Sequence, residues 1–203
     1  MKKIFISQLI VFFLLAGLLV FANPVDEKNK STNSEKEKIS VIIVGHGAPA
    51  KDFPKLKEYF QLHEHGSAEA EALEEELLNW PRTAENDPYW AGFIEVVNDI
   101  KKSGKYFSVH YAFNEMCAPT VKEALKKSLE EKPDVVIVTS IMVTPGGGHS
   151  EKDIPAEIEV FREFYPGTKI IYAWPYDVSD ISGLLMTQVN KFAEKNNYDV
   201  SKR

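Results

Sequence analysis

The feature that most constrains the fold is a pair of continuous β-branched runs, each leading to a histidine that follows glycine. The first run covers residues 39–44 and ends at His46, which lies between two glycines. The second covers residues 133–143 and leads through three consecutive glycines to His149. A continuous apolar run, unlike an alternating one, is typical of a strand that is covered on both faces. Because such strands occur mainly in parallel sheets, the two runs predict an α/β fold.

Helical patterns fill the spaces between the strands. Asp87-Pro88 is a typical helix start, with Asp as N-cap and Pro in the first turn, and apolar residues then recur at helical spacing until Gly104. Four strands alternating with four helices predict a parallel sheet with right-handed crossovers and helices on both faces. The predicted strands are 39–44, 107–113, 133–143 and 169–174, and the helices that follow them are 87–104, 119–129, 154–166 and 182–195.

A long segment, residues 51–86, separates the first strand from the next helix and is predicted to be a helical insertion. Its apolar spacing indicates two helical pieces, around 53–62 and 69–80. These amphipathic pieces fit either a lid over a site or a dimer contact. The segment also holds His63 and His65, a His-x-His pair that is either a surface feature or an aid to metal delivery. The sequence does not choose between these alternatives.

The start of the chain has the pattern of a secretory signal. Lys2 and Lys3 precede an apolar run at 4–21, which ends in the Val-x-Ala pattern that a signal peptidase recognises. We therefore predict a cleaved signal peptide at 1–22 and an exported protein, periplasmic or extracellular. Left uncleaved, the same run would be a membrane anchor, because it is nearly long enough to span a bilayer.

A polar stretch, residues 23–38, lies between this signal and the first strand. It is rich in Lys, Glu, Ser and Asn and has too few apolar residues to offset the entropy of ordering. We predict that it is a disordered tether. The remaining residues, 39–203, are enough for one α/β domain with a full core.

Charge and cysteine content exclude some partners. The formal net charge is -6, and removal of the two lysines of the signal peptide lowers it by two, to -8. An acidic chain without basic clusters argues against nucleic acid as a partner. The glycines before His149 lack the Gly-Lys-Ser/Thr ending of a phosphate-binding loop, so no nucleotide is expected. Cys117 is the only cysteine, which excludes an intramolecular disulfide.

The conspicuous polar residues follow the predicted strands directly. His46, Glu115, His149 and Asp177 each lie just past the carboxyl end of a strand. Ligands of open parallel sheets bind beyond that edge, so we expect these residues to share one site. Histidine nitrogens with a carboxylate oxygen suit Co, Ni, Fe or Zn. Because the donors come from separate loops, the site is expected to be open rather than a closed structural one.

Three motifs resemble those of a known family. The segments 44–47 (Val-Gly-His-Gly), 112–115 (Ala-Phe-Asn-Glu) and 148–155 (Gly-His-Ser-Glu-Lys-Asp-Ile-Pro) are similar to those of the CbiX-type sirohydrochlorin cobaltochelatases, which are class II tetrapyrrole chelatases. The resemblance implies a flavodoxin-like half-unit that pairs as a homodimer around a tetrapyrrole and needs no nucleotide. His46 and His149 match the two site histidines of the family, and Glu115 matches its acidic position.

The expected reaction follows from this resemblance. A divalent metal, expected to be Co²⁺ with Ni²⁺ or Fe²⁺ as alternatives, is inserted into sirohydrochlorin or a related tetrapyrrole. His46 and His149 are expected to bind the metal and to accept the pyrrole protons, because neutral imidazole can do either near pH 7. Glu115 is expected to complete the metal shell or to relay protons to solvent. No Ser or Cys nucleophile is set opposite either histidine, which argues against a hydrolase.

Sirohydrochlorin carries many carboxylates, which an acidic protein must hold with local donors. The expected donors lie beside His149, and they are the amides of Gly147 and Gly148 and the side chains of Ser150 and Lys152. The alternative function is an exported, non-catalytic carrier of a metal or tetrapyrrole, which would keep the same ligands. A membrane is expected as a partner only through the signal segment, if it is not cleaved.

Overall fold

The structure is a computed structural model that describes residues 36–63 and 68–195. The predicted signal peptide at 1–22 and most of the predicted tether lie outside the described residues. The last three tether residues, 36–38, are exposed and have no regular secondary structure. The signal, the tether and the domain boundaries therefore remain predictions.

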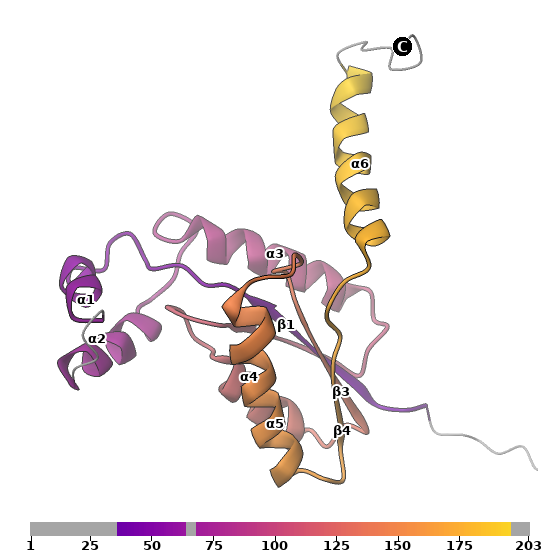
Figure 1. Cartoon of the computed structure of the whole chain (residues 1–203), viewed down its shortest axis with the longest axis horizontal. Helices are drawn as coiled ribbons and strands as arrows, with labels where there is room; N and C mark the ends of the chain where they lie inside the picture. The colour runs from indigo at the N-terminus through magenta and orange to yellow at the C-terminus, as the bar shows by residue number, and fades with distance from the viewer. Residues whose placement is uncertain (1–35, 64–67, 196–203) are drawn as a thin grey trace, which may run out of the picture. The chain divides into compact units, whose positions relative to one another are not determined.

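The sheet has four parallel strands in the order β2-β1-β3-β4 (Figure 1), which confirms the predicted α/β fold. The prediction made the third strand too long at its carboxyl end. There the Met142 N–H donates to the Ser140 hydroxyl at 3.0 Å, which turns the chain out of the sheet. The strands are β1 (Ile39–Gly45), β2 (Ser108–Phe113), β3 (Val135–Ser140) and β4 (Lys169–Tyr172).

The helices begin where local capping is available. Asp87 accepts from the Trp90 N–H, with Pro at the following position, as predicted. Thr120 and Glu123 form a capping box at the start of the next helix. The last helix begins four residues before the predicted Ser182. The helices are α1 (Leu56–His63), α2 (Ala68–Leu78), α3 (Pro88–Lys102), α4 (Val121–Glu130), α5 (Ile154–Phe164) and α6 (Val178–Lys195).

Helices cover both faces of the sheet, as predicted (Figure 1). On one face, α4 and α5 pack on all four strands around Ile42, Val136 and Val138, which are fully buried. On the other face, α3 packs on β1 and β2 through Phe93 and Val97. The sheet therefore presents its carboxyl edge, where the loops after β1 and β2 emerge, between two helical layers.

The segment 51–86 contains α1 and α2, in agreement with the two predicted helical pieces. These helices form a third apolar cluster with Phe53, Tyr59 and Trp80. Met116, from the loop after β2, packs against the same cluster. The insertion is therefore joined to one of the loops at the carboxyl edge of the sheet.

Within residues 36–63 and 68–195, no helix is both long enough and apolar enough to cross a membrane.

Candidate metal centre

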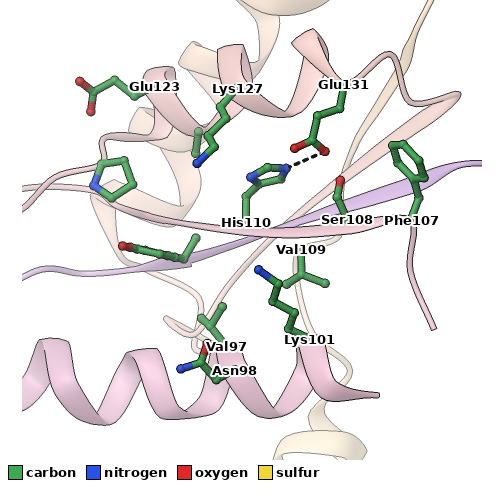
Figure 2. A pocket seen from close by; sticks show the side chains of 13 residues that line it. Val97, Asn98, Lys101, Phe107, Ser108, Val109, His110, Glu123, Lys127 and Glu131 are labelled. Atoms are coloured by element: carbon green, nitrogen blue, oxygen red, sulfur yellow. Dashed lines mark hydrogen bonds and ion pairs between the residues drawn. The ribbon is translucent and has the colours of Figure 1, made fainter. Parts of the chain in front are cut away.

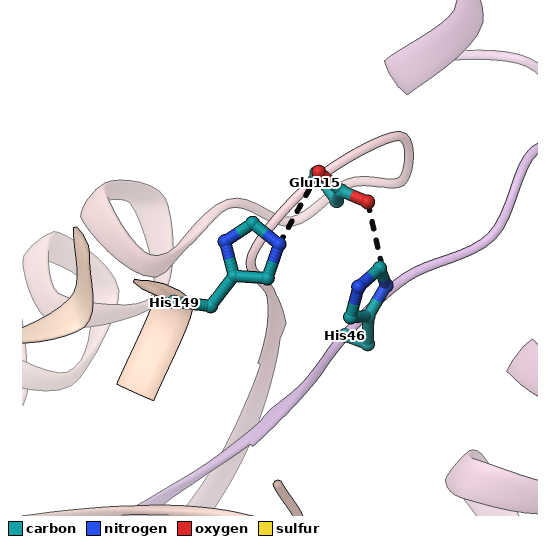
Figure 3. Close-up of side chains that lie close together, drawn as sticks. All are labelled: His46, Glu115 and His149. Carbon is teal, nitrogen blue, oxygen red and sulfur yellow. Dashed lines mark ion pairs between the residues drawn. The ribbon is translucent and has the colours of Figure 1, made fainter. Parts of the chain in front are cut away.

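Three side chains from separate segments meet beyond the carboxyl ends of β1 and β2 (Figure 3). His46 Nδ1 lies 3.4 Å from Glu115 Oε1, and His149 Nε2 lies 3.5 Å from Glu115 Oε2. The two imidazole rings meet edge to face, with centroids 4.9 Å apart. One ligand atom from each of the three residues lies within 4.8 Å of the other two. The structure thus brings together the three residues that the sequence grouped, and their role as ligands remains a prediction.

Backbone hydrogen bonds hold the loop of Glu115 against the loop of His46. The His46 carbonyl accepts from the N–H of Asn114 at 3.1 Å and from the N–H of Glu115 at 3.0 Å. Gly47 has a φ of +101°, and a Cβ at this position would lie 1.8 Å from the Glu115 carbonyl oxygen. Only glycine permits both this conformation and this approach. The Tyr89 hydroxyl adds a further tie by accepting from the His46 N–H at 2.8 Å.

His149 begins a π-helical turn, η1 (His149–Asp153), that continues directly into α5. The glycines before His149 and the polar residues after it are typical of a loop, but the backbone here is helical. The backbone is already helical because the Ile154 N–H donates to the His149 carbonyl and the Glu151 N–H donates to that of Gly147. This turn places Asp153 beside the imidazole, with Oδ2 2.7 Å from His149 Nδ1.

The contact with Asp153 decides which nitrogen of His149 faces the site. An ionised carboxylate only accepts hydrogen bonds, so the neutral ring carries its proton on Nδ1 and keeps a lone pair on Nε2, which faces Glu115. The Asn114 side chain also lies 2.7 Å from Nδ1, through the atom assigned as Nδ2. Because a protonated Nδ1 cannot accept, the Asn114 oxygen is the better assignment for this contact.

His46 is oriented through its own loop. The Gly47 carbonyl oxygen lies 2.9 Å from His46 Nδ1, the same nitrogen that faces Glu115 at 3.4 Å. The side chains of His46, Glu115 and His149 are 45%, 27% and 31% exposed, so a large ligand can reach all three. Three donors leave coordination positions open, whereas a structural zinc site is closed by four. The arrangement can therefore hold a Co, Ni, Fe or Zn ion and release it again.

Arg82, from the insertion, joins the segments around the site. Its guanidinium donates to the carbonyls of Ala48 at 2.7 Å, Leu77 at 3.0 Å and Met116. It also pairs with Asp87 at 2.9 Å, and the two side chains are only 5% and 1% exposed. One buried cation therefore holds together the loop after His46, the helix α2, the loop of Glu115 and the start of α3.

The insertion also changes the electrostatic surroundings of the site. Burial raises the pKa of Tyr59 in α1 to about 12, and the negative charges of Glu74 and Glu115 contribute. The phenol is therefore neutral at pH 7, and α1 lies near enough to Glu115 for that charge to act on it. The sequence left open whether this segment is a lid or a dimer contact, and the structure places it beside the site.

Comparison with known proteins decides the family. The model of the family described as CbiX matches residues 84–189, which are 106 of the 203 residues. The chain belongs to the CbiX family. The matched region contains Glu115 and His149 but neither His46 nor most of the insertion.

Curated relatives match only part of this chain. The chain is 33% identical over 69 residues to a sirohydrochlorin cobaltochelatase of Methanopyrus kandleri, a match that covers 34% of this chain and 48% of the relative. It is 34% identical over 89 residues to a protein of the same name from Sulfurisphaera tokodaii, which covers 43% and 70%. The chain thus matches about half the length of the first relative.

Among solved structures, the chain is similar to a putative cobalamin biosynthesis CbiX protein from Marinobacter aquaeolei. The TM-score is 0.49 at 16% identity, over 79% of this chain and 98% of the other. A similarity at this level carries no argument about the site. The assignment to CbiX rests on the sequence matches.

The predicted tetrapyrrole contacts of this CbiX chain lie around η1, but not all of them face solvent. Gly147, Gly148 and Lys152 are exposed. Ser150 is buried, so its hydroxyl would reach a bound tetrapyrrole only if the turn moved. Glu151 accepts from the N–H of Gly146 at 2.8 Å and thereby braces the glycine run. The role of these residues in binding remains a prediction.

Other residues that the sequence singled out lie elsewhere. Asp177 is exposed, and its carbonyl accepts from Asp180 at the start of α6; it is not in the cluster of ligand atoms found among the described residues. His63 ends α1 with its ring 5.2 Å from Tyr59, while its predicted pair, His65, lies outside the described residues. Of the four residues first grouped at the strand ends, three therefore converge.

A separate concave region runs along β2 between α3 and α4 (Figure 2) and contains none of the three clustered residues. In its wall His110 Nε2 lies 3.2 Å from Glu131. Partial burial raises the pKa of Glu131, but hydrogen bonds from Ser108 and His110 outweigh it, so the pKa lies below its ordinary value. His110 therefore has its partner in Glu131, and this region is not part of the candidate metal centre.

Sequence reasoning missed four residues that position the site, namely Arg82, Tyr89, Asn114 and Asp153. Asn114 and Asp153 lie inside the motifs that carried the family resemblance, and Asp153 is four residues after His149, which is one helical turn. That spacing could have indicated from the sequence that Asp153 contacts His149. No sequence pattern indicates Arg82 or Tyr89, because their partners near the site are backbone atoms of distant segments.

Proposed function

We propose that the chain inserts a divalent metal ion into sirohydrochlorin or a closely related tetrapyrrole. The observation that carries this proposal is the open cluster of His46, Glu115 and His149 at the carboxyl edge of the sheet. Membership of the CbiX family and the names of the curated relatives support it.

The cluster would first hold the incoming metal. Nε2 of His149 faces Glu115 and keeps its lone pair, because the Nδ1 proton goes to Asp153. His46 faces Glu115 through Nδ1, which would bind the ion in place of its contact with the Gly47 carbonyl. The Glu115 carboxylate lies between the two rings and adds a negative oxygen donor. With only three protein donors, the ion keeps exchangeable positions through which the pyrrole nitrogens can replace water and protein ligands.

The same residues would then take up protons. Insertion replaces two pyrrole N–H protons by one M²⁺, so two protons must leave the macrocycle. Neutral imidazole accepts a proton near pH 7, and each histidine can accept one at the nitrogen that releases the metal. Asp153 would stabilise the resulting imidazolium of His149, and the partly exposed Glu115 would pass protons to solvent.

Cobalt is the metal that we propose, since both curated relatives are named cobaltochelatases. Imidazole and carboxylate also suit Fe²⁺ and Ni²⁺, so the donor set alone does not select cobalt. No nucleotide is proposed, because nothing in the chemistry of the exchange requires one. We propose that exposed Lys152 and the amides of Gly147 and Gly148 bind the peripheral carboxylates of the macrocycle.

An absorption assay tests the reaction. The purified chain is mixed with sirohydrochlorin and Co²⁺, without nucleotide, and the spectrum of the macrocycle is followed in time. We expect insertion faster than the spontaneous rate, and a fall in kcat of about 10²-fold or more in His46→Ala and in His149→Ala. His63→Ala is the matched control, because it removes a histidine that lies outside the cluster. Unchanged rates in both site variants would contradict the proposal.

The same assay separates an enzyme from a carrier. A carrier would bind one macrocycle or one metal per chain and produce no metallated product beyond that amount. Multiple turnovers under excess substrate support the chelatase. A stoichiometric spectral change that stops after one equivalent would favour the carrier instead.

We propose that the chain acts outside the cytoplasm, on the basis of the lysine pair and the apolar run at its start. Cell fractionation followed by intact-mass measurement tests this location. We expect a periplasmic or secreted protein that lacks residues 1–22. An intact chain in the membrane fraction would support the anchor, and an intact chain in the cytosol would contradict export.

A further inference from the structure

The two edges of the sheet are finished in different ways. At the β4 edge, the N–H groups of Lys169 and Ala173 donate toward β3. Because backbone direction alternates along a strand, Ile170 turns its N–H and C=O groups outward. The guanidinium of Arg162 donates to this outward carbonyl at 3.0 Å and 2.8 Å. An arginine therefore occupies an acceptor that an added strand would need, and covering an edge in this way protects it from pairing with another chain.

The β2 edge is open along its middle. The Asn114 N–H donates to the last residue of β1 at 3.0 Å. By the same alternation, Val109, Tyr111 and Phe113 turn their N–H and C=O groups away from β1. Phe113 is covered, since its N–H donates to the carbonyl of Pro119 at 2.8 Å. In the described part of the chain, the outward backbone groups of Val109 and Tyr111 have no hydrogen-bond partner.

The helices α3 and α4 form the walls of a groove along this open edge (Figure 2). The groove has a volume of about 430 Å³, and its floor follows the chain from Phe107 to Tyr111. Val97 and Lys101 of α3 line one wall, and Lys127 of α4 lines the other. Five extended residues span about 17 Å, which is the length of a short strand. A groove that runs along a free strand edge has the form of the sites that bind an extended peptide as an additional strand.

The charges of the groove that have no partner are positive. Figure 2 shows the amines of Lys101 and Lys127 pointing toward β2 from opposite sides. Neither amine forms a hydrogen bond or an ion pair with any residue that the structure describes. The two carboxylates of the groove are already engaged, because Glu123 accepts in the capping box of α4 and Glu131 pairs with His110. Electrostatic complementarity therefore favours a ligand with negative charge.

We propose that the β2 edge binds an extended acidic segment of a partner protein, which adds a strand to the sheet. The backbone of this segment pairs with the free groups of Val109 and Tyr111. Successive side chains of a strand point to opposite faces, so two adjacent acidic residues meet Lys101 on one side and Lys127 on the other. None of the three clustered residues of the metal centre lines the groove, so a bound partner leaves that centre open. The proposal does not depend on the reaction at the centre.

An acidic peptide fits the groove better than two other ligands. A second copy of this chain, paired edge to edge through β2, would bring Lys101 and Lys127 against the same lysines of its partner, and like charges across a strand pair are destabilising. A small carboxylate would match the amines but would leave the outward carbonyls of Val109 and Tyr111 unpaired. A peptide backbone supplies both N–H and C=O groups, so it satisfies the donors and the acceptors of the edge together.

Selection of random hexapeptides displayed on phage, with the purified chain as bait, tests the charge preference. We expect the selected peptides to carry adjacent acidic residues between β-branched ones. For the best peptide, labelled and followed by fluorescence anisotropy, the double variant Lys101→Glu and Lys127→Glu should raise Kd by about 10-fold or more. The matched control, Lys102→Glu and Lys126→Glu, changes the charge equally at exposed neighbours outside the groove and should alter Kd by less than about threefold. A selection without acidic peptides, or equal Kd values for the two double variants, would overturn the proposal and leave the proposed function standing.

Backbone pairing has a separate readout. Binding of the selected peptide should slow hydrogen exchange at the amides of Val109 and Tyr111, measured by NMR, and should leave the outward amide of Ile170 at the β4 edge unchanged. N-methylation of one alternate set of peptide nitrogens should weaken binding by about 10-fold or more, because it removes the bonds to the edge while the charges stay. N-methylation of the other set, which faces solvent, should have little effect. Equal effects of the two sets, or glutarate that binds as tightly as the peptide, would show recognition of charge alone and would overturn strand addition.

Discussion

The two halves of the candidate metal centre are held in different ways. The half that carries His46 and Glu115 is held by backbone hydrogen bonds between two loops and by the buried guanidinium of Arg82. The ring of His149 is held by two side chains, the exposed Asp153 of its own turn and Asn114 of the loop after β2. The first half is thus held mainly through the backbone, whereas the second is held through side chains.

This difference predicts how each half responds to change. The loops of His46 and Glu115 cannot separate without breaking buried contacts, so a substitution there should affect folding and the site together. The ring of His149 loses one of its two side-chain contacts when the exposed carboxylate of Asp153 is removed, while the fold should stay intact. The following experiments test this contrast, in order of decreasing effect.

Arg82→Ala should have the largest effect. It leaves the carboxylate of Asp87 buried without its partner and also frees three carbonyls. We expect the free energy of unfolding to fall by about 3–5 kcal/mol, measured by urea denaturation. Lys55→Ala is the control, because it removes an exposed ion pair with Glu76, and such pairs contribute little to stability. Equal losses in the two variants would contradict the contrast.

Gly47→Ala should come next. The new Cβ would meet the Glu115 carbonyl at 1.8 Å in a backbone region that disfavours alanine. We expect a loss of about 2–3 kcal/mol in unfolding free energy together with weaker Co²⁺ binding, since the two loops must move apart. Gly148→Ala is the matched control in the other half. Gly148 already has helical φ and ψ with open space around it, so its unfolding free energy should change by less than about 0.5 kcal/mol.

Asp153→Ala should separate binding from stability. Loss of a carboxylate that orients a metal-binding histidine typically costs 10–100-fold in metal affinity. We expect such a loss in Co²⁺ affinity by calorimetry, with the unfolding free energy changed by less than about 0.5 kcal/mol. Nitrogen NMR of the imidazole should also show the proton of His149 leaving Nδ1. Asp153→Asn, which can still accept from Nδ1, should recover part of the affinity, and no recovery would argue against a positioning role.

The smallest effect is expected far from the site, at Glu131. Its pKa lies below the ordinary value of about 4.3, so its ionised form stabilises the fold above that pH, and the contribution disappears as pH falls through the lowered value. Glu131→Gln should therefore cost no more than about 0.5 kcal/mol at pH 7, because the side chain is 36% exposed. Near pH 3 the variant and the native chain should unfold alike. If the difference in unfolding free energy between the variant and the native chain instead increased as the pH fell, the result would contradict this prediction.

The sequence was sufficient to predict the convergence of residues about one hundred positions apart. His46 and His149 follow buried parallel strands, and the carboxyl ends of such strands share one edge. The same rule failed for Asp177, because β4 ends at Tyr172 and the chain between them is anchored through Trp174 to the loop after β3. Distance along the chain does not separate the two cases, since His149 lies nine positions beyond Ser140, the end of β3, and Asp177 only five beyond Tyr172. What differs is the path of the chain after the strand, which the sequence pattern does not record.

The residues that the sequence could not reveal are those that act on the backbone. Arg82 lies in a polar segment, where an arginine is usually exposed, and its carbonyl partners have no residue-specific signature. The π-helical form of η1 was also hidden, since the glycines before His149 and the polar residues after it are typical of a loop. Such features depend on tertiary contacts that a linear pattern does not record.

The burial of Cys117 bears on which ions the protein can tolerate. Burial raises the pKa of its thiol to about 11, so the only sulfhydryl of the chain is protonated and shielded at neutral pH. Thiophilic ions such as Cu⁺, Cd²⁺ and Hg²⁺ bind thiolate far more readily than nitrogen or oxygen donors. A soft metal ion would therefore find no accessible thiolate at Cys117, and its binding would be left to the nitrogen and oxygen donors of the chain.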